Sequence, residues 1–154
     1  MAPSPWDKMY NPSDMELPEF SFSEHEKNPP YFREVFKNRP KFDEYRETGY
    51  GVHGLQRHLY IKSQLKRQLA YAYGMMSFMD KYIGKILDNL KTLGLEEDTI
   101  IIFTTDHGDL FGQHGLRHKC IFHYEDLLRV PMIVKYKNHI PAGVRSDSLQ
   151  SLVD

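Results

Sequence analysis

The chain has 154 residues with 20 basic and 21 acidic side chains, and its formal net charge is -1. This length is enough to bury a core, and the near-neutral charge excludes the strong positive field on which nucleic-acid binding depends. No segment approaches the roughly 18 consecutive apolar residues of a membrane-spanning helix, so no membrane span is expected.

Residues 1–62 are predicted to form an extended arm, and residues 63–154 are predicted to form an α/β unit. Most of the nine prolines lie in the first forty residues, where fixed φ angles and missing N–H donors oppose helix interiors and central strands. The arm also carries many rings: Trp6, Tyr10, Phe20, Phe22, Tyr31, Phe32 and Phe36. A segment this apolar is not a solvated tail, so these rings are expected to lie on a folded surface, in this chain or in another.

Residues 63–93 are predicted to form one long amphipathic helix. Apolar residues recur at intervals of four and three, which places them on one helical face: Leu65, Leu69, Ala72, Met76, Met79, Ile83, Ile86, Leu90 and Leu93. Gly94 suits a C-terminal cap. A coiled coil is the alternative, but Gly74 and Gly84 favour a single helix packed on a sheet, with the methionine-rich face in the core.

Two strands are expected after this helix. Residues 99–105 form a continuous run rich in β-branched side chains, which is typical of a strand buried on both faces. A second apolar segment, Val130–Tyr136, is a plausible next strand because Pro131 is tolerated at its start. A helix, a short loop and a two-faced strand predict an α/β fold with a largely parallel sheet.

Asp106, His107 and Gly108 follow the first predicted strand. Ligands of open α/β sheets gather at the carboxyl ends of strands. Neighbouring side chains on a strand point to opposite faces, so Asp106 and His107 reach one ion only if the backbone turns, which Gly108 permits. A carboxylate and an imidazole are ordinary ligands of divalent cations. The alternative is an aspartate that caps a turn beside a loop histidine.

The segments around this junction resemble the sulfatases, a branch of the alkaline phosphatase superfamily of metal-dependent ester hydrolases. The matching segments are Met79-Asp80, Gly84-Lys-Ile-Leu87, Leu93-Gly-Leu95, Thr99 to Gly108, Gln113-His-Gly115, Lys119, Tyr124-Glu125 and Arg129-Val-Pro-Met-Ile133. The resemblance covers about half of the chain densely. It implies a partial alkaline-phosphatase-like sheet with flanking helices, so residues 63–154 are expected to be part of an incomplete sulfatase catalytic domain.

The resemblance further implies that Asp106 and His107 are metal ligands and that Lys119 contacts the anionic oxygens of a sulfate ester substrate. The implied metal is Ca²⁺, with Mn²⁺ or Zn²⁺ as alternatives. A cation and a fixed ammonium both stabilise the charge that develops during ester hydrolysis. His114 and His118 are expected to be structural. A zinc site built from histidines 107, 114, 118 and 123 is the rival interpretation, but their spacings fit no standard ligand pattern.

The nucleophile that such a hydrolase uses is absent from the sequence. Sulfatases carry a CxPxR or SxPxR motif, whereas the only cysteine, Cys120, is followed by neither the proline nor the arginine. The 154 residues are therefore expected to be the central segment of a longer sulfatase, inactive alone and completed by the remainder of the polypeptide or by a complementing chain. The alternatives are a phosphonate monoester or phosphodiester hydrolase of the same superfamily, and a non-catalytic binding module that docks through the rings of residues 6–50.

Overall fold

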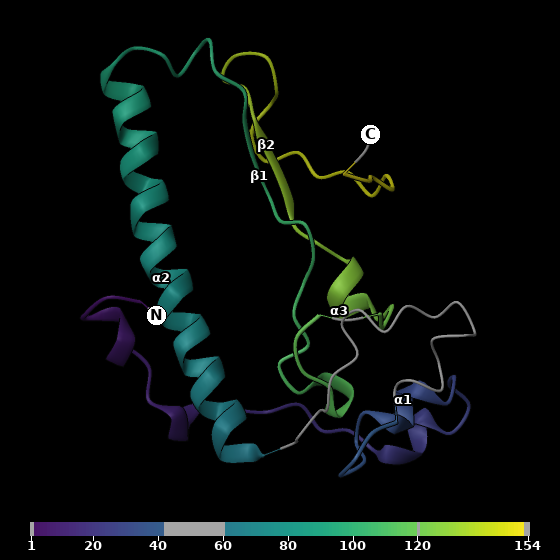
Figure 1. Cartoon of the computed structure of the whole chain (residues 1–154). Helices are drawn as coiled ribbons and strands as arrows, with labels where there is room; N and C mark the ends of the chain where they lie inside the picture. Colours follow the sequence, from purple (N-terminus) through teal and green to yellow (C-terminus); the bar gives the residue numbers. More distant parts are fainter. Residues whose placement is uncertain (1, 42–60, 120, 153–154) are drawn as a thin grey trace.

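The computed structural model describes residues 2–41, 61–119 and 121–152. Figure 1 shows a long helix and a pair of strands that extend from one folded region, which we name the base. The α-helices are α1 (Tyr31–Glu34), α2 (Lys62–Thr92) and α3 (Glu125–Leu128), the strands are β1 (Ile101–Thr104) and β2 (Met132–Lys135), and short 3₁₀ helices are η1 (Trp6–Lys8), η2 (Pro12–Asp14), η3 (Phe22–His25) and η5 (Gln113–Gly115). Within the described residues, no helix is long and apolar enough to cross a membrane. Residues 42–60 of the predicted arm lie outside the described residues.

The predicted long helix is confirmed as α2, which has 31 residues. Its C-terminal end is capped as expected. Gly94 has a φ of 69°, its N–H donates to the Lys91 carbonyl over 3.1 Å, and the Leu95 N–H donates to the Leu90 carbonyl over 3.0 Å. This pair of hydrogen bonds is the Schellman motif, in which a left-handed glycine ends a helix.

The rings at the start of the arm pack on α2, so the folded surface that they were expected to need lies within this chain. The Trp6 ring meets the Phe78 ring edge-on with centroids 5.0 Å apart. The hydroxyl groups of Tyr10 and Ser77 are 2.9 Å apart and hydrogen-bonded. η1 and η2, which belong to the arm, therefore cover one side of α2.

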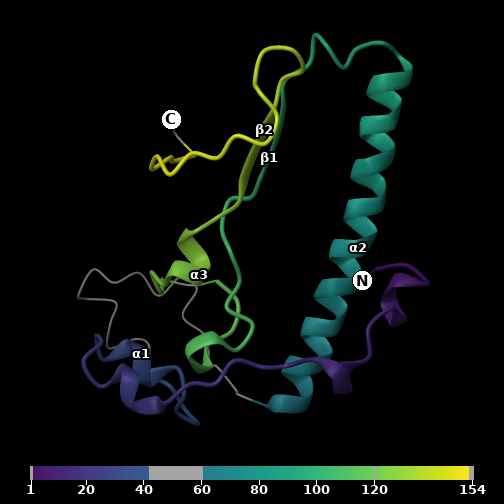
Figure 2. The ribbon, with the colours of Figure 1, turned by 180° about the vertical axis from the view of Figure 1, so that it is seen from behind.

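The predicted apolar face of α2 is largely exposed, so the expectation that it lies in the core is wrong for most of its length. Leu65 is buried, but Met76, Met79 and Ile86 are 51%, 49% and 60% exposed. Figures 1 and 2 show α2 standing apart from the strands in both views. Because α2 packs on η1 and η2 and stands apart from the strands, the described residues leave Met79 and Ile86 of this apolar stripe largely uncovered.

β1 and β2 pair antiparallel and form what we name the β1–β2 ribbon, with Ile101 opposite Lys135 and Thr104 opposite Met132. The α/β class and both predicted strands are confirmed, but the expected parallel pairing is wrong. A parallel pair needs a crossover that returns the chain to the starting end of the first strand. Here the segment between the strands turns back at the far end of β1, so β2 runs in the opposite direction (Figure 1).

The ribbon is also more exposed than its sequence predicts. Ile102, Phe103 and Ile133 are 58%, 46% and 61% exposed, so β1 is not buried on either face by the described residues. The physical reason is the same as for α2, since no described helix lies over the ribbon.

The core lies at the base, between α1 and the loops on either side of α3. Its buried residues are Tyr31, Phe32, Val35, Leu110, Leu116, Phe122 and Leu127. The rings of Phe32 and Phe122 meet edge-on with centroids 4.7 Å apart. The arm therefore forms one side of this core, and the loop that follows Asp106 and His107 forms the other.

Candidate functional site

Asp106 and His107 lie just beyond the end of β1, and their side chains converge. The Nε2 atom of His107 is 3.4 Å from Oδ2 of Asp106. The other carboxylate oxygen, Oδ1, accepts hydrogen bonds from the His107 N–H over 3.0 Å and from the Thr105 hydroxyl over 3.3 Å. The Asp106 side chain is 77% exposed and the His107 side chain 36%, so both remain accessible from solvent.

The orientation of the His107 ring fixes which nitrogen faces the carboxylate. Nδ1 lies 2.7 Å from the carbonyl oxygen of Gly108. A carbonyl oxygen only accepts hydrogen bonds, so Nδ1 carries the proton. In the neutral ring, the lone pair is then on Nε2, the nitrogen that faces Asp106.

The pKa of the Asp106 carboxyl lies below its usual value. Desolvation raises this pKa, but the positive charge that His107 carries when its ring is protonated, and the hydrogen bonds from nearby backbone N–H groups and the Thr105 hydroxyl, lower it by more. The carboxyl group is therefore ionised over a wider acid range than an ordinary aspartate, which suits a metal ligand.

Gly108 is required for a reason that its sequence position did not reveal. Its φ does not lie in the left-handed region, so the backbone turn after Asp106 does not itself demand glycine. A Cβ at this position would instead lie 1.8 Å from the carbonyl oxygen of Asp126. The Gly108 N–H donates to the Leu127 carbonyl over 3.0 Å, so this turn is pressed directly against the backbone of α3.

Lys119 is exposed in the loop that follows η5. In the described part of the chain it makes no hydrogen bond or ion pair with Asp106 or His107, so the structure does not join the three predicted site residues into one constellation. Cys120, the next residue, lies outside the described residues.

The histidines of this region do not assemble into a zinc site within the described residues, where no three potential ligands of a metal gather. His114 is held by protein groups instead. Its Nδ1 is 3.3 Å from Glu24, its Nε2 is 3.5 Å from Asp126, and its ring stacks on Tyr124 with centroids 3.7 Å apart. These contacts support the structural role expected for His114.

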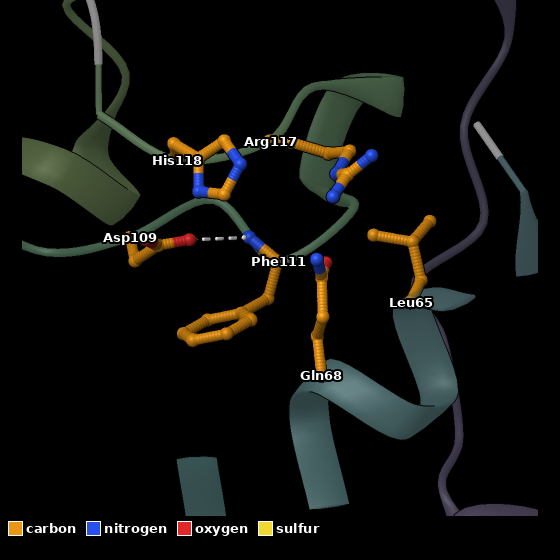
Figure 3. A pocket seen from close by; sticks show the side chains of 6 residues that line it. All are labelled: Leu65, Gln68, Asp109, Phe111, Arg117 and His118. Atoms are coloured by element: carbon orange, nitrogen blue, oxygen red, sulfur yellow. Dashed lines mark hydrogen bonds between the residues drawn. The ribbon is translucent and has the colours of Figure 1, made fainter. Parts of the chain in front are cut away.

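A small cavity of about 160 Å³ lies between the start of α2 and the loop after β1, and it was not predicted from the sequence (Figure 3). Its lining residues are Leu65, Gln68, Asp109, Phe111, Arg117 and His118. Figure 3 shows Gln68 rising from α2 toward the loop that carries Arg117 and His118. None of Asp106, His107 and Lys119 lines it. The sequence signal for this cavity was limited to the basic residues Arg117 and His118, which precede Lys119.

The sequence model of the family described as "Sulfatase" matches residues 20–154. An N-acetylglucosamine-6-O-sulfatase of Bacteroides thetaiotaomicron is 32% identical over 105 residues, which is 62% of this chain and 19% of that protein. An arylsulfatase of Clostridium perfringens is 40% identical over 93 residues, which is 60% of this chain and 19% of that protein. The chain therefore spans about a fifth of the length of these relatives.

Among solved structures, the phosphonate monoester hydrolase of Silicibacter pomeroyi superposes with a TM-score of 0.60 at 22% identity. The match covers 88% of this chain and 26% of that one. This likeness concerns the fold, and it confirms the predicted alkaline-phosphatase-like class in spite of the antiparallel ribbon.

Proposed function

The chain belongs to the sulfatase family, and on that premise we propose that it supplies one side of a sulfuric ester hydrolase site. Asp106 and His107 hold a divalent metal ion, for which the family favours calcium, and Lys119 binds the anionic oxygens of a sulfate ester. The observation that carries this proposal is the convergence of His107 Nε2 and Asp106 Oδ2 at 3.4 Å.

The two side chains fit a cation by their chemistry. Two lone-pair atoms at this separation repel each other unless a proton or a cation lies between them. Atoms that bind one Ca²⁺ at about 2.3–2.6 Å can lie 3.4 Å apart. The Gly108 carbonyl holds His107 Nδ1, and this kind of hydrogen bond sets the tautomer and orientation of metal-binding histidines. Two ligands are fewer than any of the candidate ions requires, so further ligands come from outside this pair.

A bound cation supplies stabilisation of the negative charge that develops on the ester oxygens. In the proposal, the role of Asp106 and His107 is to hold that cation at the end of β1. Lys119 contributes a compact positive charge on an exposed and flexible stem, which reaches the ester oxygens when the substrate binds. The nucleophile motif is absent from this sequence, so we propose that the chain is inactive alone.

The remaining site residues come from the remainder of the same polypeptide or from a complementing chain. The exposed apolar stripe of α2 and the exposed ribbon support this part of the proposal, because contiguous exposed apolar surface marks an interaction surface. Amide exchange tests it. We expect residues 101–104 and 132–135 to exchange much more slowly in a longer polypeptide that contains this segment than in the chain alone.

Metal binding can be tested on the chain itself by titrating Mn²⁺ and following the broadening of histidine imidazole signals by NMR. We expect His107 to broaden first and Asp106→Asn to weaken this effect. Asp88→Asn, an exposed carboxylate on α2, is the matched control and should change nothing. Broadening at His107 that Asp106→Asn leaves intact would count against the proposed ligand pair.

The role of Lys119 requires an assay of ester hydrolysis. We expect no aryl sulfate turnover from this chain with added Ca²⁺ or Mn²⁺. In a longer polypeptide that contains it, Lys119→Ala should lower turnover by about 10²-fold or more, whereas Lys91→Ala, an exposed lysine of α2, should not. Turnover by the chain alone that Lys119→Ala abolishes would contradict the proposed inactivity.

A second candidate is hydrolysis of phosphonate monoesters, which the fold likeness to the Silicibacter pomeroyi enzyme favours. Both ester classes carry anionic oxygens that a cation and a lysine can bind, so the described residues serve either reaction. The ratio of turnover on aryl sulfate to turnover on aryl phosphonate, measured with the longer polypeptide, separates the two.

A further inference from the structure

His25 is a polar side chain that is completely buried between the arm and the loop after β1. It is 0% exposed, and its Nε2 lies 2.8 Å from the carbonyl oxygen of His114. Because a carbonyl only accepts, Nε2 carries the proton and Nδ1 is left as the acceptor in the neutral ring. The hydrogen bond links residues that are 89 positions apart in the sequence.

The second nitrogen of His25 is also satisfied. Nδ1 lies 3.3 Å from the Tyr124 hydroxyl and 3.4 Å from the Asn28 side-chain nitrogen, and that nitrogen donates to the Tyr124 hydroxyl over 3.1 Å. The Tyr124 hydroxyl accepts this hydrogen bond and can donate its own proton to Nδ1. Burial raises the pKa of Tyr124, the hydrogen bond from Asn28 lowers it by less, and the charge of Glu24 adds to the rise. Removing one member leaves buried polar atoms without partners, which is costly.

His114, the residue that His25 holds, has a backbone that is unusual for a residue with a side chain. Its φ is 55° and its ψ is 22°, in the left-handed region, and such conformations persist only where surrounding contacts enforce them. The contacts are the hydrogen bond from His25, the stack on Tyr124 and the approach of Glu24 and Asp126 to the two ring nitrogens.

These contacts lead directly to the proposed metal ligands. Tyr124 precedes α3, and Asp126 lies in α3. The backbone of α3 touches Gly108 closely enough that no Cβ would fit, and Leu127 accepts the Gly108 N–H. The Gly108 carbonyl in turn holds Nδ1 of His107. A shift of α3 therefore moves the group that orients the His107 ring.

We propose that His25 is a positioning residue for the metal-binding turn. His25 lies in the arm, and it sets the orientation of the His107 ring through its contacts with His114 and Tyr124 and through α3. This inference rests on the proposed function for its consequence in metal binding. It gives the arm a task in the site, beyond covering α2 and the core.

The test compares His25→Phe, His25→Gln and Tyr124→Phe with the wild-type chain. The amide nitrogen of glutamine can replace Nε2 as donor to the His114 carbonyl, whereas phenylalanine fills the space without donating. The first readout is the NMR shift of the His107 ring and of the Gly108 amide without metal. The second is the Mn²⁺ concentration that broadens His107, and thermal unfolding is followed in parallel.

We expect His25→Phe to move the His107 and Gly108 signals and to weaken Mn²⁺ binding about tenfold, the usual size for a residue that orients a ligand. His25→Gln should restore most of both. His139→Phe replaces an exposed histidine near the C-terminal end. It should change neither the His107 and Gly108 signals nor Mn²⁺ binding. Wild-type signals in a folded His25→Phe variant would overturn the proposal, and so would a glutamine variant that is as impaired as the phenylalanine variant at equal stability.

If His25→Phe does not fold, Tyr124→Phe decides, because it removes one hydroxyl and retains the ring that stacks on His114. A several-fold loss of Mn²⁺ binding with shifted His107 signals supports the proposal, and unchanged signals reject it. Wild-type chain that does not bind Mn²⁺ through Asp106 would refute the proposed function alone, since the metal-free shifts still report on positioning.

Discussion

Replacing Gly108 with alanine is the sharpest test of how the candidate metal-binding turn is held. The new Cβ would lie 1.8 Å from the Asp126 carbonyl oxygen and 2.9 Å from its carbon. This is about 1.6 Å short of the 3.4 Å at which ordinary contact begins. Both atoms belong to backbone, so the clash cannot be relieved by turning a side chain, and the turn and α3 must separate.

Separation breaks the 3.0 Å hydrogen bond from Gly108 to Leu127, which is worth about 1 kcal/mol. Forcing a methyl group into a packed contact adds about 1–3 kcal/mol. We therefore expect Gly108→Ala to destabilise the base of the molecule by about 2–4 kcal/mol, measured as a fall in the free energy of urea unfolding. The NMR signals of Leu127 and His107 should also shift.

Gly84→Ala is the matched control, because a Cβ at position 84 of α2 meets nothing within 4 Å. Alanine favours a helix interior over glycine by about 0.5–1 kcal/mol, so this variant should be as stable as the wild type or slightly more stable. If Gly108→Ala unfolds at the same urea concentration as Gly84→Ala and leaves the His107 signal in place, the close contact between the turn and α3 is refuted.

Three further predictions concern stability. Burial raises the pKa of Glu34, but Lys37 and nearby hydrogen bonds lower it by more, so the folded-state pKa lies below 4.5. The ionised carboxylate therefore stabilises the fold above pH 4.5, and this stabilisation is lost as the pH falls through the folded-state pKa. The difference in unfolding free energy between wild type and Glu34→Gln should shrink on acidification. Gly94→Ala should cost about 1–2 kcal/mol in thermal unfolding, because its φ of 69° is left-handed. Ile102→Thr and Ile133→Thr should each cost this chain less than about 0.5 kcal/mol, since these side chains are 58% and 61% exposed, and a loss several times larger would contradict that exposure.

Local rules account for the parts of the fold that the sequence predicted well. α2 ends at Gly94 because a left-handed glycine satisfies the last carbonyls, which is a property of a few neighbouring residues. The two strands were also found from short apolar runs. The direction of their pairing was not predicted, because it depends on which end of β1 the connecting segment returns to before β2 begins. The described part of that segment carries only the short helices η5 and α3, and neither is long enough to serve as a crossover helix.

The candidate site divides in the same way. Asp106 and His107 are adjacent in the sequence, so their convergence needed only a turn after β1. The contributions of His25 and Asn28 could not be predicted, because these residues meet Tyr124 across 99 and 96 residues and an isolated histidine in a proline-rich segment carries no periodic signal. The reason for Gly108 was missed for the same cause, since the clashing carbonyl belongs to α3.

The exposed ribbon shows what a strand sequence encodes. A continuous apolar run such as residues 100–103 is typical of a strand inside a complete sheet, where other parts of the protein cover both faces. Among the described residues, Ile101–Thr104 pair with β2 alone, and Ile102 and Phe103 remain largely exposed to solvent. The solved structure that the chain resembles is much longer, since the match covers 88% of this chain but only 26% of that one. The sequence therefore predicted an environment that the described residues do not provide. The same argument applies to the apolar stripe of α2, so both surfaces should become protected together, or not at all, when a complementing polypeptide is added.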